Sequence, residues 1–320
     1  MKIPPFATIP SFHSKPWGGR AMAEVLGKEI PDGPLGESWE VSAHPNGVSR
    51  VSGGPYDLTP LDELTRAAGA DLLGARVNEK YGGAFPLLVK LIDVNALASI
   101  QVHPDDEQAR RLEGYPWGKT EAWFILSRKP NASFCLGMVP GVTAESFRAA
   151  LEKGTARSLL ATPRVDTGDC LLVPPGTVHA AGNGVLLLEI QQSSDITYRV
   201  YDWDRVDEKG QKRELHVDKA LQVIDFSARP QIFRAAAEHD VLNRVLACAH
   251  FEIFDARVAS RVALPPRDAC STGTVVEGAC RLVAGDTAID LACGQSFVIP
   301  AGTEARLDGS GARVVLTVIA

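Results

Sequence analysis

The chain has no pair of cysteines at C-x-x-C spacing, no apolar run long enough to span a membrane and no excess of basic residues. Its six cysteines are scattered, which argues against a zinc ribbon or a disulfide framework and favours reduced, mainly buried thiols. A formal net charge of −6 provides no basic surface, so we expect neither nucleic acid nor a membrane as a partner. The first 19 residues lack the apolar core of a signal peptide, and we expect a cytoplasmic protein.

Glycine and proline, in contrast, are plentiful, with 29 and 21 residues. These turn-forming residues separate short apolar runs that predict strands at 86–94, 98–103, 121–127, 169–174, 184–192 and 196–203. Leu, Ala and Phe at helical spacing predict fewer helices, at 61–77, 104–114, 143–154 and 216–226. Many short strands with a helical minority predict a mainly β fold of the sandwich or barrel type.

One supersecondary pattern occurs twice. Residues 168–190 and 294–319 share a Gly, an apolar strand and then Pro-x-Gly-Thr, which indicates two copies of one β unit. When the copies are aligned through the Thr, His179 of the first falls opposite Ala305 of the second. We therefore expect a functional domain at 1–232 and a second barrel at 233–320 that binds no metal and serves in packing or subunit contact.

Three separate segments carry candidate metal ligands. Gln101 and His103, in "SIQVHPDD" (99–106), lie two residues apart on a predicted strand, so they share one face. Glu121 opens a later strand, with Lys119 two residues before it, and His179 follows the Pro-x-Gly turn. An amide oxygen, a carboxylate and two imidazoles suit a borderline divalent ion, and the imidazoles favour zinc.

Each of these residues also has an ordinary structural explanation. A single His103 is more often a hydrogen-bonded structural histidine than a ligand, and Gln101 or Glu121 alone is compatible with a surface position. Their occurrence together in three strand-forming segments favours a shared site.

Arg199, in "ITYRVYDW" (196–203), is predicted to share a strand face with Thr197 and Tyr201. If that face is interior, the guanidinium needs a charged or dipolar partner. The alternative is a surface ion pair with Asp195 or Asp202.

Seven segments together resemble type I mannose-6-phosphate isomerases of the short bacterial form, which are zinc-dependent enzymes of the cupin superfamily. The resemblance covers most of the first 226 residues and rests on "KPWGG" (15–19), "GESWEVSAHPNGVS" (36–49), "FPLLVKLIDV" (85–94), "SIQVHPDD" (99–106), "GKTEAWFIL" (118–126), "PPGTVHA" (174–180) and "EIQQSSDITYRVYDWDR" (189–205). It implies two cupin (jelly-roll) barrels, with a few helices packed around the N-terminal one.

Carried over by position, the resemblance implies one Zn²⁺ per chain, held by His103, Glu121 and His179, with Gln101 as the fourth ligand. It places the active-site arginine at Arg199, and it puts Ser99 and Lys119 on the substrate side of the pocket.

The implied reaction is the reversible conversion of mannose 6-phosphate to fructose 6-phosphate through an enediol(ate). Arg199 and the zinc are the candidates for stabilising the enediolate oxygen. The base that moves the C–H proton stays open among Lys119, Glu189 and a hydroxide supplied by the metal; Lys119 could instead bind phosphate or polarise a hydroxyl.

The long helical insertion of the larger family members is missing here, so their phosphate-binding residues cannot be mapped one by one. The segment 202–215 supplies candidates for that role: Arg205, Lys209, Lys212 and Arg213.

Two other functions fit the same residues less well. An iron-dependent cupin oxygenase usually presents more histidines than this set does. A non-catalytic regulator that binds a sugar phosphate would be expected to carry a nucleic-acid-binding segment or to have lost Arg199. The sequence leaves the choice between a monomer and a homodimer open.

Overall fold

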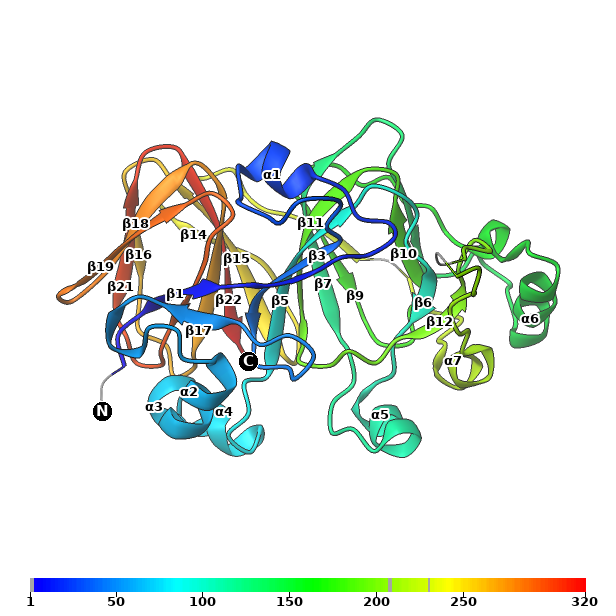
Figure 1. The fold of residues 1–320 in the computed structure, drawn as a ribbon, viewed down its shortest axis with the longest axis horizontal. Coiled ribbons are helices and arrows are strands. Elements are labelled where there is room, and N and C mark those ends of the chain that lie inside the picture. The colour runs from blue at the N-terminus through cyan, green and yellow to red at the C-terminus, as the bar shows by residue number, and fades with distance from the viewer. Residues whose placement is uncertain (1–2, 207–208, 230) are drawn as a thin grey trace.

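Four antiparallel β-sheets form the framework of the molecule in a computed structural model that describes residues 3–206, 209–229 and 231–320. The prediction of a mainly β chain is confirmed. In Figure 1 the sheets lie as successive layers, with the C-terminal strands at one end and the helices α6 and α7 at the other. The jelly-roll character of each half stays a prediction.

The two large sheets occupy the middle of the molecule. One contains, in spatial order, β13 (Gln231–Arg234), β9 (Asp169–Val173), β7 (Glu121–Arg128), β11 (Val185–Gln192), β5 (Leu87–Val94), β3 (Glu37–Ser42) and β2 (Ser11–His13). The other contains β14 (Leu242–Ala247), β15 (Phe251–Val258), β22 (Ala312–Ile319), β17 (Ser271–Glu277), β20 (Ser296–Ile299), β1 (Phe6–Ile9) and β4 (Arg50–Ser52).

Each large sheet is covered on its outer side by a four-stranded sheet. The first is covered by β12 (Tyr198–Tyr201), β6 (Ile100–Val102), β10 (His179–Gly182) and β8 (Ser133–Leu136). The second is covered by β16 (Arg261–Leu264), β21 (Ala305–Gly309), β18 (Ala279–Ala284) and β19 (Thr287–Ala292). All six predicted strands appear among these elements.

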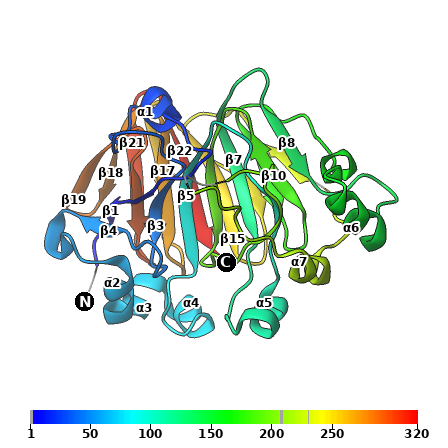
Figure 2. The ribbon, with the colours of Figure 1, turned by 45° about the vertical axis from the view of Figure 1, so that its right-hand side comes forward.

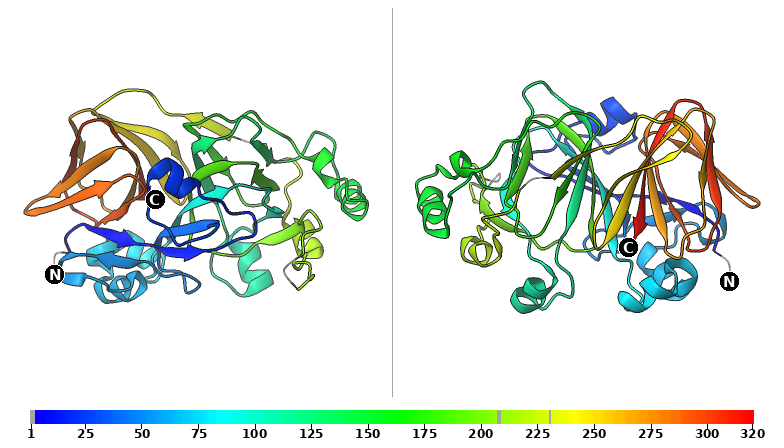
Figure 3. Two further views of the ribbon diagram at one scale, coloured as in Figure 1. Left: turned by 45° about the horizontal axis from the view of Figure 1, so that its top comes forward. Right: turned by 180° about the vertical axis from the view of Figure 1, so that it is seen from behind.

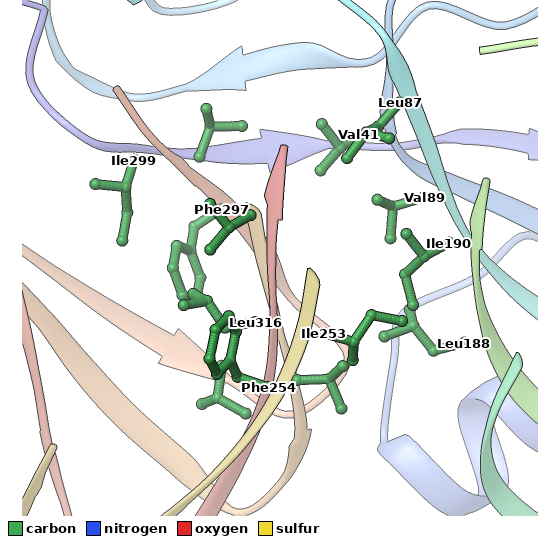
Figure 4. Packing of buried hydrophobic residues seen from close by; sticks show 14 of the residues in the cluster. Val41, Leu87, Val89, Leu188, Ile190, Ile253, Phe254, Phe297, Ile299 and Leu316 are labelled. Carbon is green, nitrogen blue, oxygen red and sulfur yellow. The ribbon is translucent and has the colours of Figure 1, made fainter. Parts of the chain in front are cut away.

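An apolar core fills the space between the two large sheets. Figure 4 shows Leu188 and Ile190 of β11 facing Ile253 of β15 across this space. Because successive side chains on a strand point to opposite faces, the residues between them point the other way, into the first half of the molecule. This alternation turns Glu189 on β11, Lys90 on β5 and Trp123 on β7 toward one interior cavity.

Seven α-helices and two short 3₁₀-helices surround the sheets in the described residues. They are α1 (Ala21–Leu26), η1 (Gly54–Tyr56), α2 (Leu61–Ala68), α3 (Ala70–Leu73), α4 (Ala75–Lys80), α5 (Asp106–Glu113), α6 (Ala144–Glu152), η2 (Ala156–Leu159) and α7 (Val217–Val223). Phe147 of α6 and Ala220 of α7 pack on the outer face of the sheet that contains β6 and β12; Figure 2 shows both helices on that side.

The prediction of one continuous helix at 61–77 is wrong. The chain forms α2, α3 and α4 there, because Gly69 and Gly74 adopt positive φ angles of 50° and 88°, which a right-handed helix does not accommodate. The other three predicted helices appear as α5, α6 and α7.

Strand pairing crosses the expected boundary at residue 232. β1 pairs with β20, so the N-terminal segment joins the sheet of the C-terminal half. β13, which contains residue 232, pairs with β9 in the other large sheet. Figure 3 shows the N-terminal strand running beside the orange and red strands. The division into domains at 1–232 and 233–320 therefore stays a prediction.

No helix in the described part of the chain is both long and apolar enough to cross a lipid bilayer.

Candidate metal centre and its cavity

His103, Glu121 and His179 come together between the first large sheet and its outer cover. His179 on β10 pairs with Gln101 on β6, while Glu121 begins β7 in the facing sheet. Gly176, in the turn before His179, has a φ of 79° and donates its backbone N–H to the carbonyl of His103 at 2.9 Å. The turn is thus tied to the segment that follows β6, which fixes the two histidines relative to each other.

The three side chains are completely buried and their ligand atoms converge. Nε2 of His179 lies 3.2 Å from Oε1 of Glu121, and Nε2 of His103 lies 3.5 Å from Oε2. All three ligand atoms lie within 4.8 Å of one another. Ligands of a tetrahedral zinc with bonds of 2.0–2.1 Å are separated by about 3.3 Å. The group is therefore of the right size for a small divalent ion.

Backbone carbonyls set the orientation of both imidazoles. Nδ1 of His103 donates to the carbonyl of Ile196, and Nδ1 of His179 donates to the carbonyl of Thr177, each at 2.8 Å. With the proton on Nδ1, each Nε2 presents a lone pair to the group. Burial lowers the pKa of His179 to about 4 and holds that of His103 well below its usual range, so both rings are neutral at pH 7.

Three of the buried ligand-type atoms in this group lack hydrogen-bond partners. Nε2 of His103 and both carboxylate oxygens of Glu121 have none of acceptable geometry, although Lys119 Nζ lies 3.0 Å from Oε2 as an ion pair. Burial raises the pKa of Glu121, and Lys119 opposes that rise. Unsatisfied buried acceptors are costly unless something binds them, and a cation fits three acceptors that face one another. The donor set therefore fits a metal.

Gln101 lies at the edge of this group. Its Nε2 is 3.2 Å from Nε2 of His179, and Oγ of Ser99 donates to its Oε1 at 3.4 Å. The two ends of an amide have nearly the same shape, so exchanging them would bring the oxygen to the ligand side.

A cavity of about 320 Å³ opens from the group. Five cationic and three acidic side chains are among those that line it: Lys15, Lys90, Lys119, Arg199, Arg213, Glu37, Glu189 and Asp195. Lys90 and Lys119 lie at its buried end, whereas Lys15 and Arg213 are about one-third exposed. The excess of cations matches an anionic ligand of small-molecule size.

Glu189 occupies the buried end with two lysines. Lys90 Nζ lies 3.2 Å from its Oε2, and Nε1 of Trp123 donates to its Oε1 at 3.2 Å. Burial alone would raise the pKa of Glu189, but Lys119 and Lys90 outweigh burial and keep this carboxylate ionised. Glu121 and Glu189 in turn raise the pKa of Lys119 against the effect of burial.

Sequence reasoning missed Lys90 and Glu37 as cavity residues. The signal for Lys90 was a lysine with apolar residues on both sides in the middle of the strand "PLLVKLIDV". Such a side chain is buried only where a charge or a cavity receives it.

Arg199 lies on the cavity side of β12, opposite Gln101 of β6. Its Nε donates to Oγ of Ser99 at 3.4 Å and its Nη1 to the carbonyl of Glu214 at 2.9 Å. Within the described residues it forms no ion pair, so surface pairing with Asp195 or Asp202 is not what the structure contains. Burial, and next the charge of Arg213, lower the pKa of Arg199.

The prediction that Tyr201 shares the face of Arg199 is wrong. The pairing register shifts between the two residues, because the strand bulges at Val200. Thr197 and Arg199 line the metal-side cavity, whereas Tyr201 lines a second cavity on the other side of β12.

Among the candidates in 202–215, only Arg213 reaches the main cavity. Arg205 and Lys212 line the second cavity.

Known proteins resemble this chain over nearly its whole length. The model of the phosphomannose isomerase type I catalytic domain matches residues 6–121. Mannose-6-phosphate isomerase ManA of Bacillus subtilis is 36% identical over 315 residues, 97% of each chain, and the probable mannose-6-phosphate isomerase GmuF of the same species is 36% identical over 302 residues, 93% of each. A crystal structure of the mannose 6-phosphate isomerase from B. subtilis superposes with a TM-score of 0.88 at 32% identity, covering 98% of this chain and 99% of that one.

Proposed function

This chain belongs to the type I phosphomannose isomerase family, and on that basis we propose that it is a zinc-dependent isomerase that interconverts mannose 6-phosphate and fructose 6-phosphate. The observation that carries the proposal is the buried group of His103, Glu121 and His179, whose unsatisfied atoms face one another beside a cation-rich cavity.

His103, Glu121 and His179 would hold the zinc, with the amide oxygen of Gln101 as the fourth ligand. When bound, the ion supplies Lewis-acid polarisation of a substrate oxygen. Two neutral imidazoles, one amide and one carboxylate leave such a site with net positive charge, which suits an ion that takes part in catalysis.

The isomerisation moves a proton between C2 and C1 of the sugar while negative charge develops on an oxygen. Arg199 can donate hydrogen bonds to that oxygen, and its contact with Ser99 orients the guanidinium. Glu189, held ionised beside Lys90, is the carboxylate available to take the C–H proton. The ammonium group of Lys119, which pairs with Glu121, has further N–H donors that can reach a sugar hydroxyl.

The cavity also accounts for recognition of the phosphate. A sugar phosphate is dianionic near neutral pH, and the lining cations outnumber the acids. The buried end holds the group suited to the reacting carbons, so the sugar would enter with its carbonyl end first.

A coupled assay with mannose 6-phosphate, run before and after chelation, tests this function. Chelation should abolish turnover, and stoichiometric Zn²⁺ should restore it. His103→Ala should lose zinc and activity together, whereas His239→Ala, which changes an exposed histidine, should lose neither. A metal-free variant with full activity would refute the metal site, and binding of mannose 6-phosphate without conversion would favour the regulator instead.

A further inference from the structure

Arg213 connects the two cavities that flank β12. Its side chain lines the metal-side cavity and also the second cavity, of about 370 Å³, on the opposite side of the strand. Its guanidinium is held by Asp202, the residue that directly follows β12: Nε donates to Oδ2 at 2.7 Å, and Nη2 contacts Oδ1. Two parallel contacts between a guanidinium and a carboxylate restrict the arginine to one geometry.

Arg205 in turn holds Asp202 in place. Nε of Arg205 donates to the backbone carbonyl of Asp202 at 3.2 Å, its Nη1 donates to the carbonyl of Leu97 at 2.5 Å, and its Nη2 contacts the Asp202 carboxylate. The Asp202 side chain is 6% exposed. The carboxylate therefore stands at a defined place and presents Arg213 to the cavity.

Among the described residues around Asp202, cationic side chains outnumber acidic ones. One carboxylate, Asp202, serves both Arg205 and Arg213. Arg199 lies on the same wall, bonded to the carbonyl of Glu214, which is the residue next to Arg213, and it has no acidic partner among the described residues. Guanidinium groups that share too few carboxylates leave a place for an anion.

We propose that Arg213 binds the phosphate group of the substrate at the mouth of the cavity, and that Asp202 is the positioning residue that holds its guanidinium there. This inference rests on the proposed function. Arg213 is 32% exposed, whereas the side chains of His103, Glu121 and His179 are at most 2% exposed. The phosphate thus stays at the mouth while the carbonyl end reaches the metal ligands.

Steady-state kinetics with mannose 6-phosphate, together with inhibition by inorganic phosphate, test the proposal. Arg213→Ala should raise KM and the inhibition constant of phosphate by about 10- to 100-fold, the effect of losing a hydrogen bond to a charged group. We expect kcat to change by less than about threefold and zinc content to stay at one per chain, because Arg213 contacts neither the reacting carbons nor the metal ligands. Arg213→Lys should recover part of the loss, because lysine restores the positive charge but not the two parallel N–H donors of a guanidinium group.

Asp202→Asn should reproduce the KM defect without touching the substrate. In the double variant with Arg213→Ala the defect should equal that of Arg213→Ala alone, because both changes break one unit. Asp204→Asn is the matched control: Asp204 is the neighbouring acid, it is exposed, and it pairs with Lys212 rather than with Arg213. Its KM should match the parent protein.

An unchanged KM in Arg213→Ala would overturn the proposal, as would a large KM increase in Lys15→Ala that Arg213→Ala lacks. Additive defects of Asp202→Asn and Arg213→Ala would remove the positioning role. Thermal unfolding identifies any variant that fails to fold. If Asp202→Asn does not fold, the KM of Arg213→Lys still tests whether Arg213 binds the phosphate. A parent protein that binds phosphate but lacks isomerase activity would refute the proposed function, and the phosphate-binding comparison would still decide the role of Arg213.

Discussion

The two copies of the Gly–strand–Pro-x-Gly-Thr unit share the backbone conformation of the turn but differ in the side chain that follows it. In the first, β9 leads through the turn to β10 and β11; in the second, β20 leads to β21 and β22. Gly176 and Gly302 have φ angles of 79° and 70°, and the following Thr donates to the Pro carbonyl at 3.2 and 3.3 Å. His179 begins β10 and Ala305 begins β21. The equivalent position after the turn thus carries a candidate metal ligand in the first copy and only a methyl group in the second.

The two interiors differ accordingly. In the first half, polar side chains surround a cavity, and Arg199 has no acidic partner among the described residues. In the second half, Ala305 belongs to an apolar cluster. On the face of β22 that meets the first large sheet, the buried Arg313 lies 5.0 Å from the ring of Phe124 and makes two hydrogen bonds to Asp255, at 2.9 and 2.8 Å. An arginine without a counter-charge is available to a ligand, whereas an arginine already paired with carboxylates is not.

The largest effect should come from exchanging the residues at the start of β10 and β21. His179→Ala should lower zinc affinity and turnover by more than about a hundredfold, beyond the loss caused by removing an outer-shell partner. Ala305→His should bind no second zinc, because Ala305 pairs with Leu264 where His179 pairs with Gln101. Metal content by mass spectrometry and the coupled assay measure both. Two zinc ions per chain in Ala305→His would break the comparison.

Arg199→Ala should reduce kcat by about a hundredfold or more, the usual loss when a donor to a developing oxyanion is removed. Zinc content and melting temperature should stay near those of the parent, since Arg199 forms no ion pair within the described residues. Normal turnover in this variant would take Arg199 out of the mechanism.

Arg313→Met should lower stability and leave turnover unchanged, the opposite of the result expected for Arg199→Ala. It removes two hydrogen bonds from the buried Asp255 carboxylate and leaves Nε of Arg257, 3.6 Å from Oδ2, as a remaining ion-pair partner, so the variant should lose up to about 3–5 kcal/mol of unfolding free energy in urea. Activity per folded molecule should be unchanged, and adding Asp255→Asn should recover part of the loss. Arg281→Met, which breaks the exposed pair with Asp290, should cost no more than about 1 kcal/mol. Equal losses in the two arginine variants would contradict the distinction.

The smallest expected effect is the difference in stability loss between alanine substitutions at the two turn glycines, Gly176 and Gly302. Gly302→Ala should cost about 1–2 kcal/mol, because its positive φ disfavours a side chain but a Cβ would meet nothing within 4 Å. Gly176→Ala should cost more, since its Cβ would lie 2.8 Å from the carbonyl oxygen of Val223. It should also weaken zinc binding by shifting His179. Urea denaturation compares them, and a smaller loss at Gly176 would show that the first turn adapts.

Local patterns predicted most of the elements. Short apolar runs between turn residues predicted the strands that became β5, β7 and β11. Residues at helical spacing predicted α5, which Asp105 caps by accepting the backbone N–H of Gln108. The helix at 61–77 was predicted as one piece because its spacing continues across Gly69 and Gly74, and only the backbone angles show the breaks.

Residues contributed by long-range packing were not predictable in the same way. Lys90 lies on a strand whose neighbours are apolar, so its role depends on which face of β5 meets the cavity. β1 joins the C-terminal sheet across a separation of nearly the whole chain, and the side of β12 on which Tyr201 falls depends on one bulge. Pairings at such separation leave no local periodic signal.

The sequence by itself determined the mainly β fold, the repeated turn and the candidate ligands His103, Glu121 and His179, because short apolar runs, Pro-x-Gly turns and residue chemistry are local properties. Only the tertiary structure decided that the three ligands converge on unsatisfied buried atoms and that Arg199 lacks an acidic partner among the described residues while Arg313 has two. The reason is physical: the energy of a buried charge depends on what lies across the interior from it, and that neighbour comes from a distant part of the chain.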